Sequence, residues 1–332
     1  MHAKHLNRIS EKLSQAALRL GSGIAAAALL CLAPPTAHAA RALDWTKTTE
    51  TKVALFYPGQ SSWEWVMTQK DHSGAKKFRE GKNCKSCHEG EQKAMGEKLV
   101  KGGKLEPTPP LGKSPTLTLK VATMRDEARL YFRLRWTGAA PGGAKLDPEY
   151  AERVTVMLDD GHIKEATRAG CWGSCHDDAI GMASAPKGAK ISKYLAASRS
   201  KITRSGGGEN FKPAAALDQM LKTGNFIEYW HARLNPGKPA QAIGGYILEK
   251  RHELSGSGVA AEATQKNGEW TVVLSRPLKA TQPGQKDLVP GKVYSIGFSI
   301  HDNYANHRFH HVSFEQTLVL DQGKANFVAT KK

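Results

Sequence analysis

The chain has 332 residues and a formal net charge of +17 at neutral pH. This length is ample for one large domain or two small ones. Beyond residue 39 no stretch approaches 18 consecutive apolar residues. We therefore expect no transmembrane helix there.

Residues 1–39 have the pattern of a secretory signal peptide. A basic start is followed by an apolar stretch over residues 23–32 and by Ala37-His38-Ala39, an A-x-A cleavage site. We predict that this segment is cleaved and that the protein is periplasmic and soluble after export. Cys31 lies in this segment and is removed with it.

The basic charge survives cleavage, because residues 1–39 contribute four positive and one negative side chain and leave +14 on the remainder. Nucleic acid is not expected as a partner of an exported protein. From charge alone a plain solvated surface is the first interpretation, and the more specific one is attraction to an acidic redox partner or peripheral contact with a membrane surface.

A strand predicted over residues 52–57 precedes a lysine-rich segment, residues 61–105, whose spacing fits helices. This segment contains Cys84-Lys85-Ser86-Cys87-His88, a C-x-x-C-H motif. In a c-type site two thiols bind the haem covalently and the adjacent His binds the iron. A redox dithiol would need a thioredoxin-like context, and a zinc site would need a second cysteine pair nearby. We predict haem attachment at Cys84 and Cys87, with His88 as the proximal iron ligand.

Residues 106–115 are rich in proline and end this segment as a linker. Beyond the linker the pattern changes to a period of two. Apolar residues alternate with polar ones over residues 116–121 and again over 130–136, with Arg125-Asp126-Glu127 between them. The pattern predicts a half-buried β-hairpin.

A strand predicted over residues 153–158 leads to the second cysteine motif. Cys171-Trp172-Gly173-Ser174-Cys175-His176 has one more residue between its cysteines than the first motif. Gly173 gives the backbone the freedom to accommodate the extra residue. A disulfide between cysteines four residues apart would be strained. We predict a second covalent haem at Cys171 and Cys175, with His176 as the proximal ligand.

Residues 180–222 show no strand pattern, and further strands follow them. These are predicted at 226–234, 243–249, 259–264, 270–276, 293–301 and 309–320. Asn267-Gly268 is a hairpin turn. Eight or more short strands separated by turns predict an antiparallel β-sandwich.

The order of several segments resembles a known family. These segments are residues 130–136, the 153–158 strand with the C-W-G-S-C-H loop, and residues 226–233, 270–278 and 308–320. Over residues 115–325 they are similar to the haem-binding domain of the ethylbenzene dehydrogenase gamma subunit and related c-552-type cytochromes, which is akin to DOMON domains. The resemblance implies an immunoglobulin-like β-sandwich with a haem near one end, and a role in electron transfer.

The chain departs from the dehydrogenase subunits in two respects. Those subunits hold a non-covalent haem b with Met and Lys ligands, whereas the Cys171–His176 loop implies covalent attachment. The family's Lys ligand lies just before a V-S-aromatic run, and the matching position here is His310. The resemblance therefore makes His310 the expected distal ligand of the second haem. His311 is the alternative, because neighbouring strand residues face opposite ways.

The first haem also needs a distal ligand. His72, twelve residues before Cys84, resembles the upstream histidines of multihaem cytochromes. Met95 is the alternative and would raise the reduction potential relative to two histidines.

We thus expect a mainly β protein with a small helical c-haem module near its N-terminus. Residues 1–39 are the signal peptide, 40–110 the first strand and the C-x-x-C-H module, and 111–332 the sandwich with the C-x-x-x-C-H loop. Two covalently bound haem c groups predict an electron carrier without catalytic residues. It would pass electrons between a membrane or periplasmic donor, such as a membrane cytochrome b, and a terminal acceptor or enzyme.

Two other functions fit the motifs. One is a haem enzyme, a peroxidase or small-oxyanion reductase, which would need an open iron position beside acid–base groups. The other is a non-catalytic redox subunit of a molybdenum-enzyme complex.

Overall fold

The computed structural model describes residues 43–59, 63–103, 105–138, 145–170, 194–201 and 211–332. Residues Asp44–Lys332 form one compact unit. None of the helices in the described ranges is long and apolar enough to cross a membrane.

Strands make up most of the described chain. They join into one hydrogen-bonded sheet with the order β7-β6-β5-β4-β10-β11-β1-β2-β3-β9-β8, and β12 pairs with β10 and β13. The pairings are antiparallel except for β12 with β13, which is parallel. The strands are β1 (Thr51–Phe56), β2 (Thr116–Arg125), β3 (Arg129–Thr137), β4 (Glu152–Asp159), β5 (Ile227–Leu234), β6 (Gln241–Ile247), β7 (Arg251–Leu254), β8 (Ala260–Lys266), β9 (Glu269–Pro277), β10 (Val293–His301), β11 (His311–Val312), β12 (Gln316–Leu320) and β13 (Phe327–Ala329).

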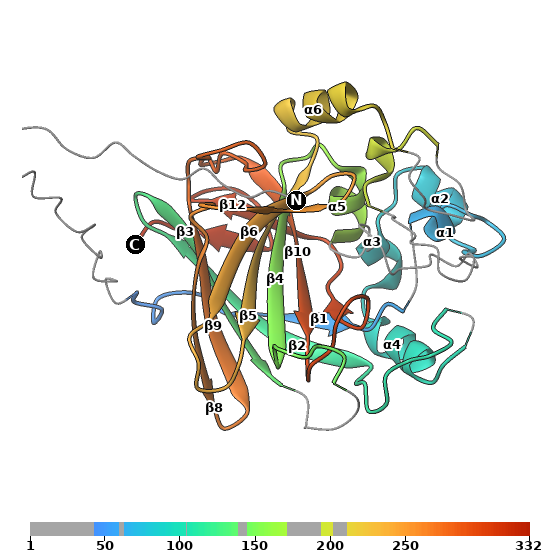
Figure 1. Cartoon of the computed structure of the whole chain (residues 1–332), viewed down its shortest axis with the longest axis horizontal. Helices are drawn as coiled ribbons and strands as arrows, with labels where there is room; N and C mark the ends of the chain where they lie inside the picture. Colours follow the sequence, from blue (N-terminus) through green and yellow to red (C-terminus); the bar gives the residue numbers. More distant parts are fainter. Residues whose placement is uncertain (1–42, 60–62, 104, 139–144, 171–193, 202–210) are drawn as a thin grey trace, which may run out of the picture. The chain divides into compact units, whose positions relative to one another are not determined.

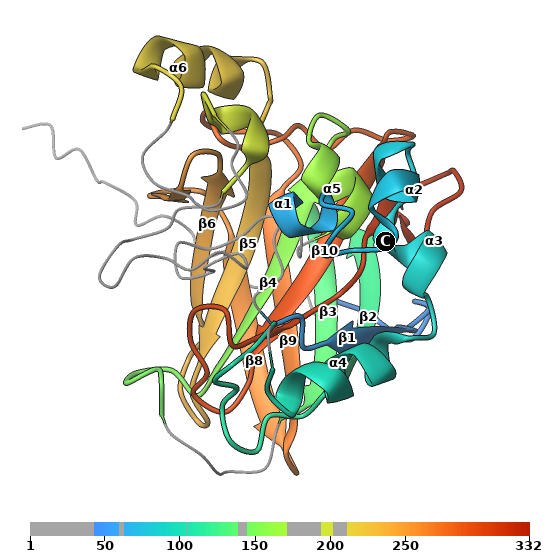
Figure 2. The same ribbon diagram turned by 90° about the vertical axis from the view of Figure 1, so that its right-hand side faces the viewer.

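The helices are short and lie mostly together. Four of them connect β1 to β2, and α5 follows β4. Figures 1 and 2 show α1 to α5 gathered on one side of the strands. The helices are α1 (Trp63–Val66), α2 (Ala75–Arg79), α3 (Cys84–His88), α4 (Gln92–Val100), α5 (Lys164–Ala169), a 3₁₀ turn (Ala196–Ser198) and α6 (Ala214–Lys222).

The sheet folds over so that its two halves pack face to face. Phe132 on β3 contacts Trp230 on β5 and Phe298 on β10, with ring centroids 5.5 and 6.2 Å apart. All three rings are fully buried in one core cluster. Burial of each such side chain contributes about 1.5–3 kcal/mol. The predicted β-sandwich is confirmed.

The first hairpin follows directly from the period-two pattern. On β3, Leu130, Phe132, Leu134 and Trp136 are buried, while the residues between them are partly exposed. At the turn, the Asp126 carboxylate accepts hydrogen bonds from two backbone N–H groups, which closes the connection from β2 to β3.

One predicted strand is in fact two. Residues 309–320 form β11 and β12, separated by residues 313–315. β11 pairs with β1 and β10, whereas β12 pairs with β10 and β13, so the chain changes neighbours between them. The Ser313 hydroxyl accepts a hydrogen bond from the backbone of Phe298 at this point. The short strands β7 and β13 were not predicted, because three or four residues carry too little alternation to be recognised.

A buried ion pair joins the two layers near one end of the core. Arg276 on β9 and Glu228 on β5 are completely buried, with 2.8 Å between Arg276 Nε and Glu228 Oε1. The Glu228 carboxylate also accepts hydrogen bonds from Trp230 Nε1 and from the backbone N–H of Lys286. A buried charge persists only when it is neutralised and hydrogen-bonded in this way.

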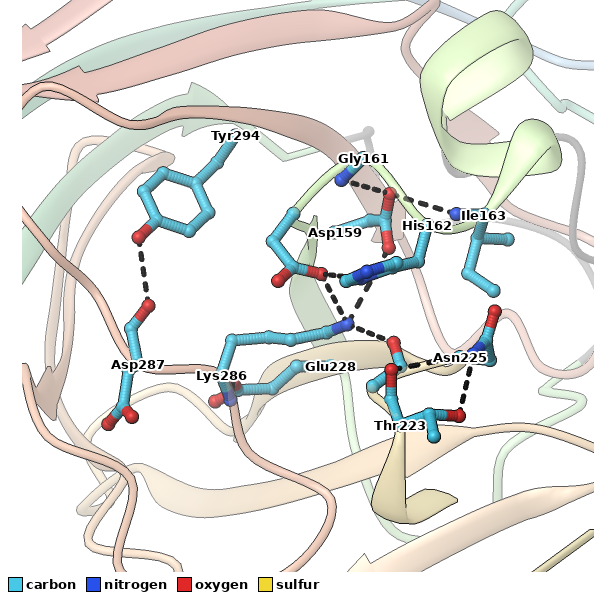
Figure 3. Close-up of polar contacts among 12 residues, drawn as sticks. Asp159, Gly161, His162, Ile163, Thr223, Asn225, Glu228, Lys286, Asp287 and Tyr294 are labelled. Carbon is cyan, nitrogen blue, oxygen red and sulfur yellow. Dashed lines mark hydrogen bonds and ion pairs between the residues drawn. The ribbon is translucent and has the colours of Figure 1, made fainter. Parts of the chain in front are cut away.

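The Lys286 side chain extends this network to the start of α5 (Figure 3). Its ammonium group donates to Asp160 Oδ1 at 2.6 Å and to the carbonyl of Gly224. The neighbouring Asp159 carboxylate accepts from the backbone of Gly161 and Ile163. These contacts fix the turn from which α5 begins.

We expect Arg276→Met to lower the free energy of unfolding by about 3–5 kcal/mol, because Glu228 would stay buried without its partner. Urea unfolding followed by far-UV circular dichroism measures this. Lys266→Met, an equivalent change at an exposed position of β8, should change it by no more than about 0.5 kcal/mol. A loss below about 1 kcal/mol in Arg276→Met would contradict the role of the pair.

Candidate functional site

Helix α3 consists of the first cysteine motif itself. The Asn83 side chain accepts a hydrogen bond from the backbone of Ser86 at 2.8 Å and caps the helix. Residues three apart lie on one face of a helix, so Cys84 and Cys87 are neighbours on α3. Cys84 is buried and Cys87 is exposed. A single capped turn therefore presents both thiols and His88 together.

Helix α3 lines a cavity of about 440 Å³. Apolar side chains from several elements form much of its wall, among them Phe56 at the end of β1, Phe78 on α2 and Phe314 after β11. The cavity is also lined by Cys84, Cys87, His88, His72 and Met95. The structure thus brings together every residue that the sequence assigns to the first haem.

His72 and His88 both line this cavity and lie close together. Their ring centroids are 6.1 Å apart and the rings are inclined by 39°. Two imidazoles that bind one metal ion from opposite sides, each with a metal–nitrogen distance of about 2.0–2.1 Å, hold their centroids roughly 6 Å apart. The observed spacing fits a six-coordinate iron between them.

The Nδ1 atom of each imidazole is hydrogen-bonded to another group of the protein. His72 Nδ1 lies 3.0 Å from the carbonyl of Val66, and His88 Nδ1 lies 2.8 Å from Glu91 Oε2. A carbonyl and a carboxylate can only accept, so each Nδ1 carries the proton. Nε2 then keeps its lone pair, as an iron ligand requires. Glu91 was not predicted from the sequence, although its spacing of three residues from His88 was a usable signal.

Met95 on α4 lines the same cavity, and Trp65 packs against His72 with 5.3 Å between ring centroids. The choice of His72 over Met95 stays a prediction. The histidine pair supports it, because His72 already has the separation from His88 that a shared iron requires.

The environment of Cys84 differs from that of a redox dithiol. Burial raises the pKa of the Cys84 thiol well above its ordinary value, and the nearby Glu315 carboxylate acts in the same direction. Redox-active cysteines have lowered pKa values. A buried thioether to a haem carries no charge, so this position suits covalent attachment.

The second motif, with Cys171, Cys175 and His176, lies outside the described residues. The structure does describe Gly170, the residue before it. Gly170 has φ +63°, and a Cβ there would lie 2.8 Å from the backbone nitrogen of Glu315. Glycine is therefore required at this position. The second haem stays a prediction.

Helix α5, which ends just before the second motif, is tied to the first haem segment. The Arg168 guanidinium stacks over the Phe78 ring at 4.1 Å, and Arg168 Nε donates to the carbonyl of Lys82. This contact ties α5 to the segment that precedes the first motif.

His311 is held in the fold by both of its ring nitrogens. Nε2 lies 2.8 Å from the carbonyl of Ser114 and Nδ1 lies 3.2 Å from Asp302 Oδ1, and the side chain is completely buried. Since neither nitrogen faces open space, this geometry disfavours His311 as an iron ligand.

His310 precedes β11 rather than forming part of it, so the alternation expected for a strand does not apply. Its ring packs on His301 with centroids 4.5 Å apart, and its Nδ1 lies 2.8 Å from the carbonyl of His307. The role of His310 as distal ligand of the second haem stays a prediction.

Comparison with known proteins agrees with this geometry. The family model described as ethylbenzene dehydrogenase matches residues 43–267 and 243–313. The protein is 34% identical over 300 residues to cytochrome c-552 of Stutzerimonas stutzeri, which covers 90% of this chain and 94% of that protein. The chain belongs to this family of c-type cytochromes with an ethylbenzene dehydrogenase domain. It is therefore a haem-dependent electron-transfer cytochrome.

Two weaker similarities accompany this match. Cytochrome c-551 of Rhodocyclus tenuis is 26% identical over 87% of this chain and 99% of that protein. A solved family 9 carbohydrate-binding module from Caldicellulosiruptor kristjanssonii, in complex with glucose, aligns at 11% identity and a TM-score of 0.28 over 60% of this chain and 66% of that chain. That structural similarity is too low to inform fold or function.

We expect His72→Ala to open one iron to an external ligand, because the variant removes the imidazole that we predict as its distal ligand. The absorption spectrum of the reduced protein, recorded before and after adding carbon monoxide, measures this. The variant should show a shift equivalent to one haem. His162→Ala, which removes a histidine that pairs with Asp160 away from the cavity, should match the wild type. If carbon monoxide binds His72→Ala no better than the control, His72 is not a ligand.

Proposed function

We propose that the chain is an exported dihaem cytochrome c that carries electrons and performs no substrate chemistry of its own. The observation that carries this proposal is the pair of His72 and His88 beside Cys84 and Cys87 in one cavity. An iron with two strong protein ligands has no open position for a substrate, which suits transfer rather than catalysis. This argues against a peroxidase or reductase at the first haem.

Each group in the cavity has a role in this proposal. Cys84 and Cys87 would hold the haem covalently, and His88 and His72 would bind its iron. The haem supplies a one-electron couple. The apolar walls would exclude water, and the cations of Lys77 and Lys98, which line the same cavity, would supply positive charge for the haem carboxylates.

The proposed second haem is attached at Cys171 and Cys175, with His176 as proximal and His310 as distal ligand. Gly170, the last residue that the structure describes before this motif, packs on the backbone of Glu315, and the Glu315 side chain accepts a hydrogen bond from the backbone of Lys85 within the first motif.

The proposed partners are redox proteins outside the cytoplasm. The signal-like residues 1–39 support export to the periplasm. The net charge of +14 on the remainder favours partners with acidic surfaces. A membrane cytochrome b as donor and a terminal reductase or molybdenum enzyme as acceptor fit this role, and peripheral contact with the membrane fits the same charge.

We expect the purified protein to contain two covalent haems per chain, measured by the pyridine haemochrome spectrum and the intact mass. Replacing Cys84 and Cys87 by Ser should remove one haem, and replacing Cys171 and Cys175 should remove the other. Cys31→Ser is the matched control and should leave both, because Cys31 lies in the segment proposed to be cleaved.

Two results would overturn parts of this proposal. A chain that keeps two haems after loss of Cys171 and Cys175 would disprove the second attachment site. Carbon monoxide binding by the reduced wild-type protein would show an open iron and would favour the haem-enzyme alternative.

A further inference from the structure

Glu315 lies at the junction of the two haem-attachment segments. It follows β11, and only 7% of its surface is exposed. Its Oε1 accepts a hydrogen bond of 3.2 Å from the backbone N–H of Lys85, inside the first cysteine motif. Its own backbone packs against Gly170, one residue before the second motif. The carboxyl group is therefore next to the first attachment helix.

The other carboxyl oxygen of Glu315 is not satisfied. Oε2 is buried and accepts no hydrogen bond from the residues that the structure describes. An ionised carboxylate with one buried, unpaired oxygen is costly, and protonation removes that cost. Burial raises the pKa of Glu315 to about 7, against the opposing effect of the Lys85 hydrogen bond. The group can thus change its protonation near neutral pH.

The charges around Glu315 come from two helices. On α3, the Lys85 ammonium favours the ionised form, and Glu89, which follows the helix, disfavours it. On α5, Arg168 lies near Cys84, which itself faces Glu315. Once Cys84 is joined to a haem it no longer titrates. In the proposed function, the charge near Glu315 that changes is then that of the haem iron, which alternates between its oxidised and reduced states.

We propose that Glu315 tunes the reduction potential of the haem at Cys84 and Cys87 and binds a proton when that haem is reduced. This rests on the proposed function of the first motif. One electron from the redox partner takes the iron from +3 to +2, and one proton from water binds the Glu315 carboxylate to give a carboxylic acid. On oxidation the iron loses the electron to the next redox partner and the Glu315 carboxylic acid releases the proton to water. The coupling arises because the negative carboxylate stabilises the more positive, oxidised site.

The test is a potentiometric titration of the purified dihaem protein from about pH 5 to about pH 9, which spans the titration of such a group. One midpoint potential should fall as pH rises, by at most about 59 mV per pH unit, since one proton accompanies one electron. In Glu315→Gln that potential should stay near its acid-side value across the range, because Gln resembles the protonated acid.

Glu262→Gln is the matched control, because this exposed carboxylate lies on β8 and is not among the groups that act on Glu315. It should keep the pH dependence of the wild type. His72→Met shows which of the two midpoint potentials belongs to the first haem, since a Met ligand raises the potential of that haem. A wild-type potential that does not change with pH overturns the inference, even if the Gln variant does not fold. So does an unchanged pH profile in Glu315→Gln. Absence of haem at Cys84 and Cys87 would instead disprove the proposed function.

Discussion

The pairing of β1 with β11 is the constraint on which the rest of the structure depends. It joins the two halves of the sheet at the point where one layer passes into the other, with Phe56 opposite Val312. Phe56 ends β1 and contacts Phe314 just beyond β11, with ring centroids 4.8 Å apart. These two rings form part of the cavity wall. The fold of the sandwich and the shape of the site are therefore decided by the same few residues.

The cavity then depends on helices that are too short to be stable alone. Helices α1 to α4 have between four and nine residues, and isolated helices of fewer than about 12–15 residues are marginal in water. They are held by packing on the sheet, by caps such as Asn83, and by links such as Arg168 to Phe78. A covalent haem between α3 and His72 would add a further link within this group.

Much of this could be predicted from local sequence signals. The hairpin of β2 and β3 follows from strict alternation, and the C-x-x-C-H motif identifies its own chemistry within five residues. The placement of His72 near His88 was a weaker prediction, and the structure supports it because the chain between them folds back. The roles of the histidines after β10 could not be assigned from the sequence, because the contacts of His311 are with Ser114, 197 residues away, and with Asp302, nine residues away. Glu315 was missed for the same reason: its burial depends on α3 and α5, which lie far from it in the sequence.

The first haem module occupies the connection between two adjacent antiparallel strands. Phe56 at the end of β1 is paired directly with Thr116 at the start of β2, so the inserted residues leave and rejoin the sheet at neighbouring positions, with Cα atoms about 4.5–5.5 Å apart. A tight turn could close the same gap, and lengthening such a loop costs little free energy. The module is thus an insertion in the connection of a β-hairpin. The pairing of β1 with β2 therefore does not depend on the inserted residues.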